Sequence, residues 1–155
     1  MADNVTLREV QEADLPVLYE HQRDPVAWHM AAFSSRERDD FMAHWRKIMG
    51  DPALCQRAVL LDGELVGNVS CFERQGLREV GYWIAREHWG KGIASRALAL
   101  LLEEITIRPL HAFVVADNVG SVRVLEKNGF FALRHEKLYM EVRGEEVEEL
   151  MMVLE

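Results

Sequence analysis

The sequence is organised around a seven-residue stretch, Trp89-Gly90-Lys91-Gly92-Ile93-Ala94-Ser95, that joins two apolar segments of different period. The segment before it, 80–85, is short, continuous and aromatic, which is typical of a buried strand. The segment after it has apolar residues at 93, 97, 98, 101 and 105, the spacing of one helix face. The first backbone N–H groups of a helix have no internal partner, and the helix dipole is positive there. The stretch therefore predicts an anion-binding loop, in which the glycines permit close approach and Lys91 adds positive charge.

The spacing excludes two common phosphate-binding motifs. A P-loop requires Gly-Lys-Ser/Thr at a fixed distance after a first glycine, and the stretch does not provide it. A Rossmann fingerprint requires a third small residue, and Arg96 or Ser95 would have to serve in that position. It also requires an acidic ribose-binding residue after a second strand, which the sequence does not provide. An ordinary strand-to-helix turn stays open as the alternative to a phosphate loop.

A second stretch, 117–130, predicts a helix with clear start and stop signals. Asn118 is a good N-cap residue, because its side chain can accept a hydrogen bond from the first turn. Gly129 after Asn128 predicts a left-handed helix end. Phe130 then returns the chain to the core.

Together the two stretches resemble the GNAT superfamily of N-acetyltransferases. Its acyl-CoA pyrophosphate loop is usually written Gln/Arg-x-x-Gly-x-Gly/Ala, and Gly92 and Ala94 match the small positions. Trp89 stands where Gln or Arg is usual, and with the run 79–84 this is similar to the branch that acetylates ribosomal-protein N-termini. The second stretch resembles the signature Asn-x-x-Ser-x-x-Val-Leu-Glu-Lys-x-Gly-Phe of the same superfamily.

The resemblance implies acetyl-CoA as co-substrate and direct transfer of its acetyl group to an amine. In the superfamily, the central strand splays from its neighbour, and its free backbone groups hold the pantetheine arm and polarise the thioester carbonyl. For the strand residues, plain core packing stays open as the alternative. The implied cofactor contacts are Tyr82, Trp83, Ile84, Trp89, Gly90, Lys91, Gly92, Ile93, Ala94, Ser95 and Asn118.

The acid and the base are defined less well by the resemblance. Many members use a tyrosine seven positions after the motif asparagine as the acid, and here Leu125 stands there. Ser121 is the candidate acid, with a local helix-start hydrogen bond as its alternative role, and Tyr139 is a second candidate. Glu79 is the candidate base, acting on the amine through water; a strand-end salt bridge or a substrate anchor is its alternative role.

Composition and charge narrow the class of protein. The 155 residues suit a single domain, 1–155, and 49% hydrophobic with 28% charged residues is typical of a globular protein. A net charge of −8 argues against a nucleic-acid partner, and it suits either a cationic acceptor or solubility alone. Neither a signal pattern nor an apolar run of about 20 residues is present, which predicts a cytoplasmic protein without membrane association.

The cysteines and histidines do not predict a metal site. Cys55 and Cys71 are interpreted as reduced, packed thiols. The six histidines show no zinc-ligand spacing with each other or with the cysteines, so no metal is predicted.

Periodicity and turn signals predict the remaining elements. A first helix begins near Asp14 as N-cap, and two helices follow within 26–50, the second capped at Ser34 or Ser35. Asp62-Gly63 predicts a hairpin turn, and Pro109 ends the helix that begins at Ile93 near Ile107. The predicted strands are 5–10, 56–61, 64–72, 77–85, 110–116, 131–140 and 147–154, with the last two joined at Arg143-Gly144-Glu145.

This order predicts an α+β fold: a GNAT-like three-layer α/β/α arrangement with a mixed, mostly antiparallel sheet and a splayed central strand pair. The predicted function is acetyl-CoA-dependent N-acetylation of a primary amine, either a small molecule or a protein N-terminus. A catalytically silent acyl-CoA-binding sensor or interaction module is the alternative. A homodimer stays open beside a monomer.

Overall fold

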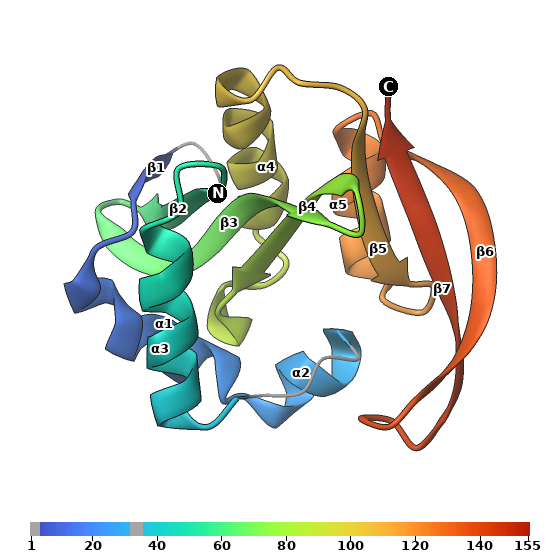
Figure 1. Cartoon of the computed structure of the whole chain (residues 1–155), viewed down its shortest axis with the longest axis horizontal. Helices are drawn as coiled ribbons and strands as arrows, with labels where there is room; N and C mark the ends of the chain where they lie inside the picture. The colour runs from blue at the N-terminus through green and yellow to red at the C-terminus, as the bar shows by residue number, and fades with distance from the viewer. Residues whose placement is uncertain (1–3, 32–35) are drawn as a thin grey trace.

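The computed structural model describes residues 4–31 and 36–155, and its framework is a seven-stranded sheet in the order β1-β2-β3-β4-β5-β7-β6 (Figure 1). The predicted elements of this part of the chain are present, while the predicted caps Ser34 and Ser35 lie outside the described residues. The strands are β1 (Val5–Glu9), β2 (Cys55–Leu61), β3 (Glu64–Arg74), β4 (Leu77–Ile84), β5 (Leu110–Val115), β6 (Phe131–Met140) and β7 (Glu145–Leu154). The helices are α1 (Leu15–Gln22), α2 (Pro25–Ala31), α3 (Arg38–Met49), α4 (Ile93–Glu104) and α5 (Val119–Lys127), with short 3-10 helices η1 (Glu12–Asp14) and η2 (Arg86–His88).

The first four strands form an antiparallel meander whose hairpin turns follow from the local sequence. Asp62 and Gly63 both have positive φ, 52° and 84°, as a two-residue turn between right-twisted strands requires. Gln75 and Gly76 repeat this geometry between β3 and β4, with φ of 51° and 79°. The predicted Asp-Gly hairpin is therefore confirmed.

The sheet opens between its two central strands. β4 and β5 run parallel and pair only at Glu79 and His111, whereas the other neighbouring strands pair antiparallel over most of their length. Beyond that contact the two strands diverge, and Figure 1 shows the two halves of the sheet separating towards α2. The predicted mixed, mostly antiparallel sheet with a splayed central pair is confirmed.

Helices cover both faces of the sheet. The two faces separate at adjacent residues of β2, since Val59 belongs to the core under α4 and Ala58 to the core under α1 and α3. The predicted inner face of α4 is confirmed: Ile93, Leu98 and Leu101 are at most 1% exposed. Burial of each such side chain stabilises the fold by ~1.5–3 kcal/mol.

Two local predictions need correction: the partner of the Asp14 side chain and the end of α4. Asp14 occupies the N-cap position of α1 as predicted, but its side chain makes no capping bond to the helix. Its carboxylate instead receives two hydrogen bonds from Arg8 (2.7 and 2.9 Å) and one from the Gln11 amide (2.8 Å). The two parallel bonds to the Arg8 guanidinium are charge-assisted and bidentate, which fixes the geometry of the carboxylate. α4 ends at Glu104, three residues before the predicted Ile107, because Ile105 has already turned to extended backbone ahead of the proline.

Candidate active site

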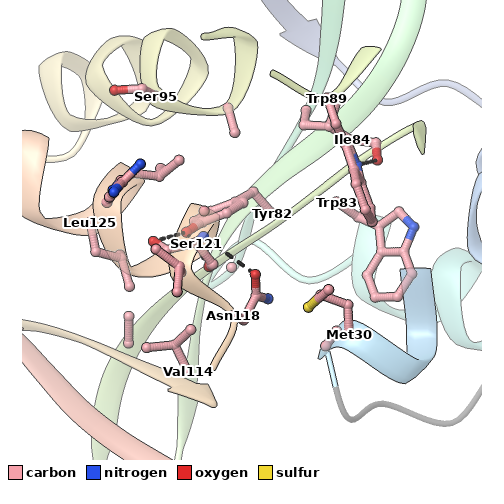
Figure 2. Close-up of a pocket in the computed structure, with 18 of the residues that line it drawn as sticks. Met30, Tyr82, Trp83, Ile84, Trp89, Ser95, Val114, Asn118, Ser121 and Leu125 are labelled. Atoms are coloured by element: carbon pink, nitrogen blue, oxygen red, sulfur yellow. Dashed lines mark hydrogen bonds between the residues drawn. The ribbon is translucent and has the colours of Figure 1, made fainter. Parts of the chain in front are cut away.

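A cavity of about 830 Å³ occupies the opening between β4 and β5. Its walls are the C-terminal half of β4, the start of α4, β5, α5 and the inner side of α2 (Figure 2). A cavity of this size lies within the range of small-molecule sites. Of the predicted cofactor residues, all except Lys91 line it.

The start of α4 has the backbone of an anion site. Gly92 precedes the helix in the left-handed conformation (φ 77°) and Gly90 has φ of 78°, which is why glycine stands at both positions. The first intrahelical bond of α4 runs from the Arg96 amide to the Gly92 carbonyl oxygen (3.1 Å). The amides of residues 93–95, which line the cavity or border it, thus have no partner within the helix.

Positive side chains reach this cavity from α5. Lys91 is exposed and does not line the cavity, whereas Arg123 and Lys127, four residues apart on one face of α5, do. The side chain of Asn128 holds the two helices together by donating to the carbonyl oxygens of Ser95 (3.2 Å) and Val124 (2.9 Å). The sequence analysis missed Arg123 and Lys127, and their i, i+4 spacing within the second motif was the available signal.

The backbone of β4 faces the cavity at alternate residues. The Ala85 amide donates to Val66 across the β3 side (2.9 Å), so Tyr82 and Ile84 direct their backbone groups to the open β5 side. The Ile84 carbonyl accepts a hydrogen bond from the Trp89 indole Nε1 (2.8 Å). Trp89 therefore fastens the loop to β4, and the Tyr82 amide is left facing the cavity.

Two hydroxyl groups meet inside the cavity. The Tyr82 hydroxyl lies 2.6 Å from Ser121 Oγ, and either oxygen can be the donor; it also lies 3.1 Å from the Ser121 carbonyl oxygen. Burial raises the pKa of Tyr82 to about 12, against a smaller lowering by the Ser121 hydrogen bond. Asn118 accepts from the Ser121 amide (3.4 Å), which confirms it as the N-cap of α5. Figure 2 shows Tyr82, Ser121 and Asn118 together, with Leu125 beside them.

The end of the cavity near α2 is largely apolar. Ala27, Met30 and Ala31 line it from α2, and Trp83 lines it from β4. The indole N–H of Trp83 donates to the His21 carbonyl oxygen at the end of α1 (3.2 Å), which fixes the ring.

Two predicted catalytic residues do not line the cavity. Glu79 is 3% exposed on β4, and both carboxylate oxygens accept hydrogen bonds from Arg74 (2.9 and 3.0 Å). Tyr139 is 67% exposed on β6. His88, which the sequence analysis did not select, does line the cavity, and its Nδ1 atom is buried without a hydrogen-bond partner.

The described residues 4–31 and 36–155 contain no group of three metal-ligating side chains. Within the same ranges, none of the helices combines the length and the apolar composition that a membrane crossing needs.

Comparison with known proteins identifies the family. A family model for the acetyltransferase (GNAT) domain matches residues 4–131, which is most of the chain. The chain belongs to the GNAT acetyltransferase family. The loop before α4, the splayed strands and the second motif all lie within the matched residues.

Named relatives cover part of the sequence. The chain is 39% identical over 77 residues to the probable N-acetyltransferase YjcK of Bacillus subtilis, covering 44% of this chain and 42% of YjcK. It is 31% identical over 100 residues to the putative ribosomal N-acetyltransferase YdaF of the same organism, covering 60% and 55%. The matches thus span about half the length of these curated relatives.

A solved structure extends the likeness to the whole GNAT fold. Spermidine N-acetyltransferase from Vibrio cholerae, in complex with CoA and spermine, superimposes with a TM-score of 0.84 at 22% identity, covering 97% of this chain and 95% of that one. At this identity the likeness supports the fold.

Proposed function

We propose that the protein is an acetyl-CoA-dependent N-acetyltransferase that moves the acetyl group to a primary amine by direct attack within a ternary complex. The observation that carries the proposal is one continuous cavity, lined by an anion-binding helix start, the open backbone of β4 and a buried hydroxyl pair. A binding module needs the first of these features, and acyl transfer needs all three.

The chain's own residues provide the cofactor contacts. The free amides of residues 93–95, with the side chains of Arg123 and Lys127, suit a pyrophosphate. The pantetheine arm fits along Tyr82, Trp83 and Ile84. The Tyr82 amide, which faces the cavity, is the donor that would polarise the thioester carbonyl and stabilise the negative charge developing on its oxygen.

The Ser121–Tyr82 pair is the proposed acid. Attack by the amine releases CoA as a thiolate, which needs a proton. Ser121 lies on the cavity wall, and the Tyr82 hydroxyl, 2.6 Å away, can replace the proton that Ser121 gives up. This pair supplies a hydroxyl donor although Leu125 occupies the usual tyrosine position.

The base that accepts the ammonium proton has two candidates. Glu79 is the residue selected from the sequence, and it reaches the amine only through water, because Arg74 holds both of its oxygens. His88 lines the cavity with an unpartnered Nδ1, and a neutral imidazole accepts a proton without the loss of an ion pair. The pH profiles of Glu79→Gln and His88→Gln distinguish the two.

The apolar acceptor end favours a protein or peptide N-terminus over a polyamine. Asp117 is the acidic residue among the described lining residues, and Arg143 already neutralises it. A polycation would require several free carboxylates, whereas an amino terminus with a small apolar side chain matches Ala27, Met30 and Trp83. The relative YdaF is named as a putative ribosomal acetyltransferase, which agrees with this choice.

The test is a screen for thiol release from acetyl-CoA, with alanine- and serine-initiated peptides and with spermidine as acceptors. We expect turnover with the peptides to exceed turnover with spermidine. Acetyl-CoA binding without turnover on any amine would instead support the silent sensor.

A further inference from the structure

Arg143 lies in the turn between β6 and β7, yet its side chain is only 5% exposed. Its guanidinium donates in three directions: Nε to the His29 carbonyl oxygen (2.9 Å), Nη2 to the Met30 carbonyl oxygen (2.9 Å) and Nη1 to the Asp117 carboxylate. One side chain therefore connects the hairpin, the end of α2 and the start of α5.

The bonds from Arg143 satisfy two carbonyl groups at the end of α2. α2 has seven residues, and the last carbonyl groups of a helix have no partner within it. Ala27 is its buried residue, whereas Val26 and Met30 are 45% and 37% exposed. A cation at a helix C-terminus is also favoured by the helix dipole. Arg143 thus adds polar contacts to the end of a helix in which Ala27 is the buried residue.

The two segments that Arg143 joins both line the cavity. Ala27, Met30 and Ala31 belong to α2, while Asp117 and the α5 cap Asn118 belong to the other segment. Figure 2 places the side chains of Met30 and Asn118 at this end of the cavity. A shift of α2 relative to α5 would change the space that the acceptor must enter, on the opposite side from the anion-binding helix start.

We propose that Arg143 is a positioning residue for the acceptor: it holds the end of α2 against the start of α5 and so sets the width of the acceptor end of the cavity. This role rests on the proposed acetyltransferase function. The cofactor end does not depend on it, because the start of α4 is held by Asn128 instead.

The experiment compares Arg143→Gln and Arg143→Lys with the control Arg57→Gln. Arg57 forms an ion pair with Glu104 and does not line the cavity, so the control removes a comparable interaction elsewhere. The first measurement is hydrogen exchange of residues 25–31 in the free protein, which requires no turnover. Both Arg143 variants should raise this exchange several-fold while α4 and the control stay unchanged. Lysine fails as a substitute because one ammonium group does not reproduce the planar fork.

The second measurement is steady-state kinetics with an alanine-initiated peptide and with spermidine. The Arg143 variants should raise KM for the acceptor about tenfold, since a displaced wall misaligns the amine. The dissociation constant of acetyl-CoA should stay within about twofold, because the pyrophosphate contacts are elsewhere.

Unchanged exchange in α2 overturns the proposal, and so does faster exchange with an unchanged acceptor KM. A wild-type protein that turns over neither acceptor refutes the proposed function, and the exchange result then decides by itself whether Arg143 holds α2. If Arg143→Gln does not fold, Arg143→Lys, which keeps the charge, decides the same points.

Discussion

Replacing Tyr82 by phenylalanine removes one hydroxyl from the cavity and leaves the aromatic ring in place. The lost contacts are the 2.6 Å bond to Ser121 Oγ and the 3.1 Å bond to its carbonyl oxygen. Because the Ser121 hydroxyl can rotate to another acceptor, the cost in unfolding free energy should be about 1 kcal/mol. General acids contribute ~10²–10⁴-fold to rate, so turnover should fall by about 10²-fold or more if the pair protonates the leaving thiolate.

The Ser121→Ala variant and the double variant make the argument specific. If the two hydroxyls act as one donor, each single substitution should cost nearly as much turnover as both together. Tyr139→Phe is the matched control, since it is the same substitution on an exposed β6 residue outside the cavity. It also tests Tyr139 as the alternative acid.

The assay is thiol release with saturating acetyl-CoA, accompanied by calorimetric binding of acetyl-CoA and thermal unfolding. Acetyl-CoA affinity should change little, because the hydroxyl pair does not belong to the anion site. Wild-type turnover in both Tyr82→Phe and Ser121→Ala would refute the shared-donor mechanism and leave water as the proton source.

Further predictions concern the loop, the cap, the buried carboxylate and alkaline pH. Gly92→Val forces a β-branched residue to φ of 77° and should weaken acetyl-CoA binding strongly while unfolding stays cooperative; wild-type affinity by calorimetry would refute the loop assignment. Asn118→Ala should lower the unfolding free energy by ~0.5–1 kcal/mol, which is the low end of the range for a lost N-cap because the capping bond is long, at 3.4 Å. Loss of turnover in the folded variant would show a functional role for Asn118, whereas unchanged turnover would leave capping as its only role. Glu79→Gln should lower thermal stability by ~1–3 kcal/mol through the Arg74 contacts and leave the pH profile of turnover unaltered; a flattened profile would instead establish Glu79 as the base. Because burial raises the pKa of Tyr82 to about 12, the neutral hydroxyl contributes its full stabilisation below pH 10, and about 3 kcal/mol of unfolding free energy should be lost as pH rises from 10 to about 12. Denaturant unfolding at a series of pH values measures this loss, and Tyr82→Phe should reduce it.

The features that the sequence predicted well are those that neighbouring residues determine. Positive φ at Gly129 follows from the absence of a side chain, and the N-cap at Asn118 follows from a residue three positions away. The inner face of α4 follows from its 3.6-residue period. The family motifs also direct attention to Gly92 and Asn118, and both residues line the cavity.

The features that the sequence did not predict depend on contacts between distant residues. The Tyr82–Ser121 bond joins residues 39 apart in the chain, and the Arg143–His29 bond joins residues 114 apart. The partner of the Asp14 side chain was missed for a similar reason: the local pattern correctly gives its N-cap position, but the carboxylate binds Arg8 on β1. Periodicity carries no information about such partners.

The position of the proposed acid illustrates why geometry, and not sequence position, defines a catalytic role. Leu125 is 1% exposed and packs in the core cluster, although family members often carry a tyrosine there. Tyr82 approaches from β4 on the same side of the sheet and brings its hydroxyl to Ser121, one helical turn before Leu125. A leucine at 125 is compatible with this arrangement, because Tyr82 and Ser121 already bring hydroxyl groups to the cavity. The missing tyrosine, which by itself favours a silent sensor, therefore does not count against catalysis in this chain.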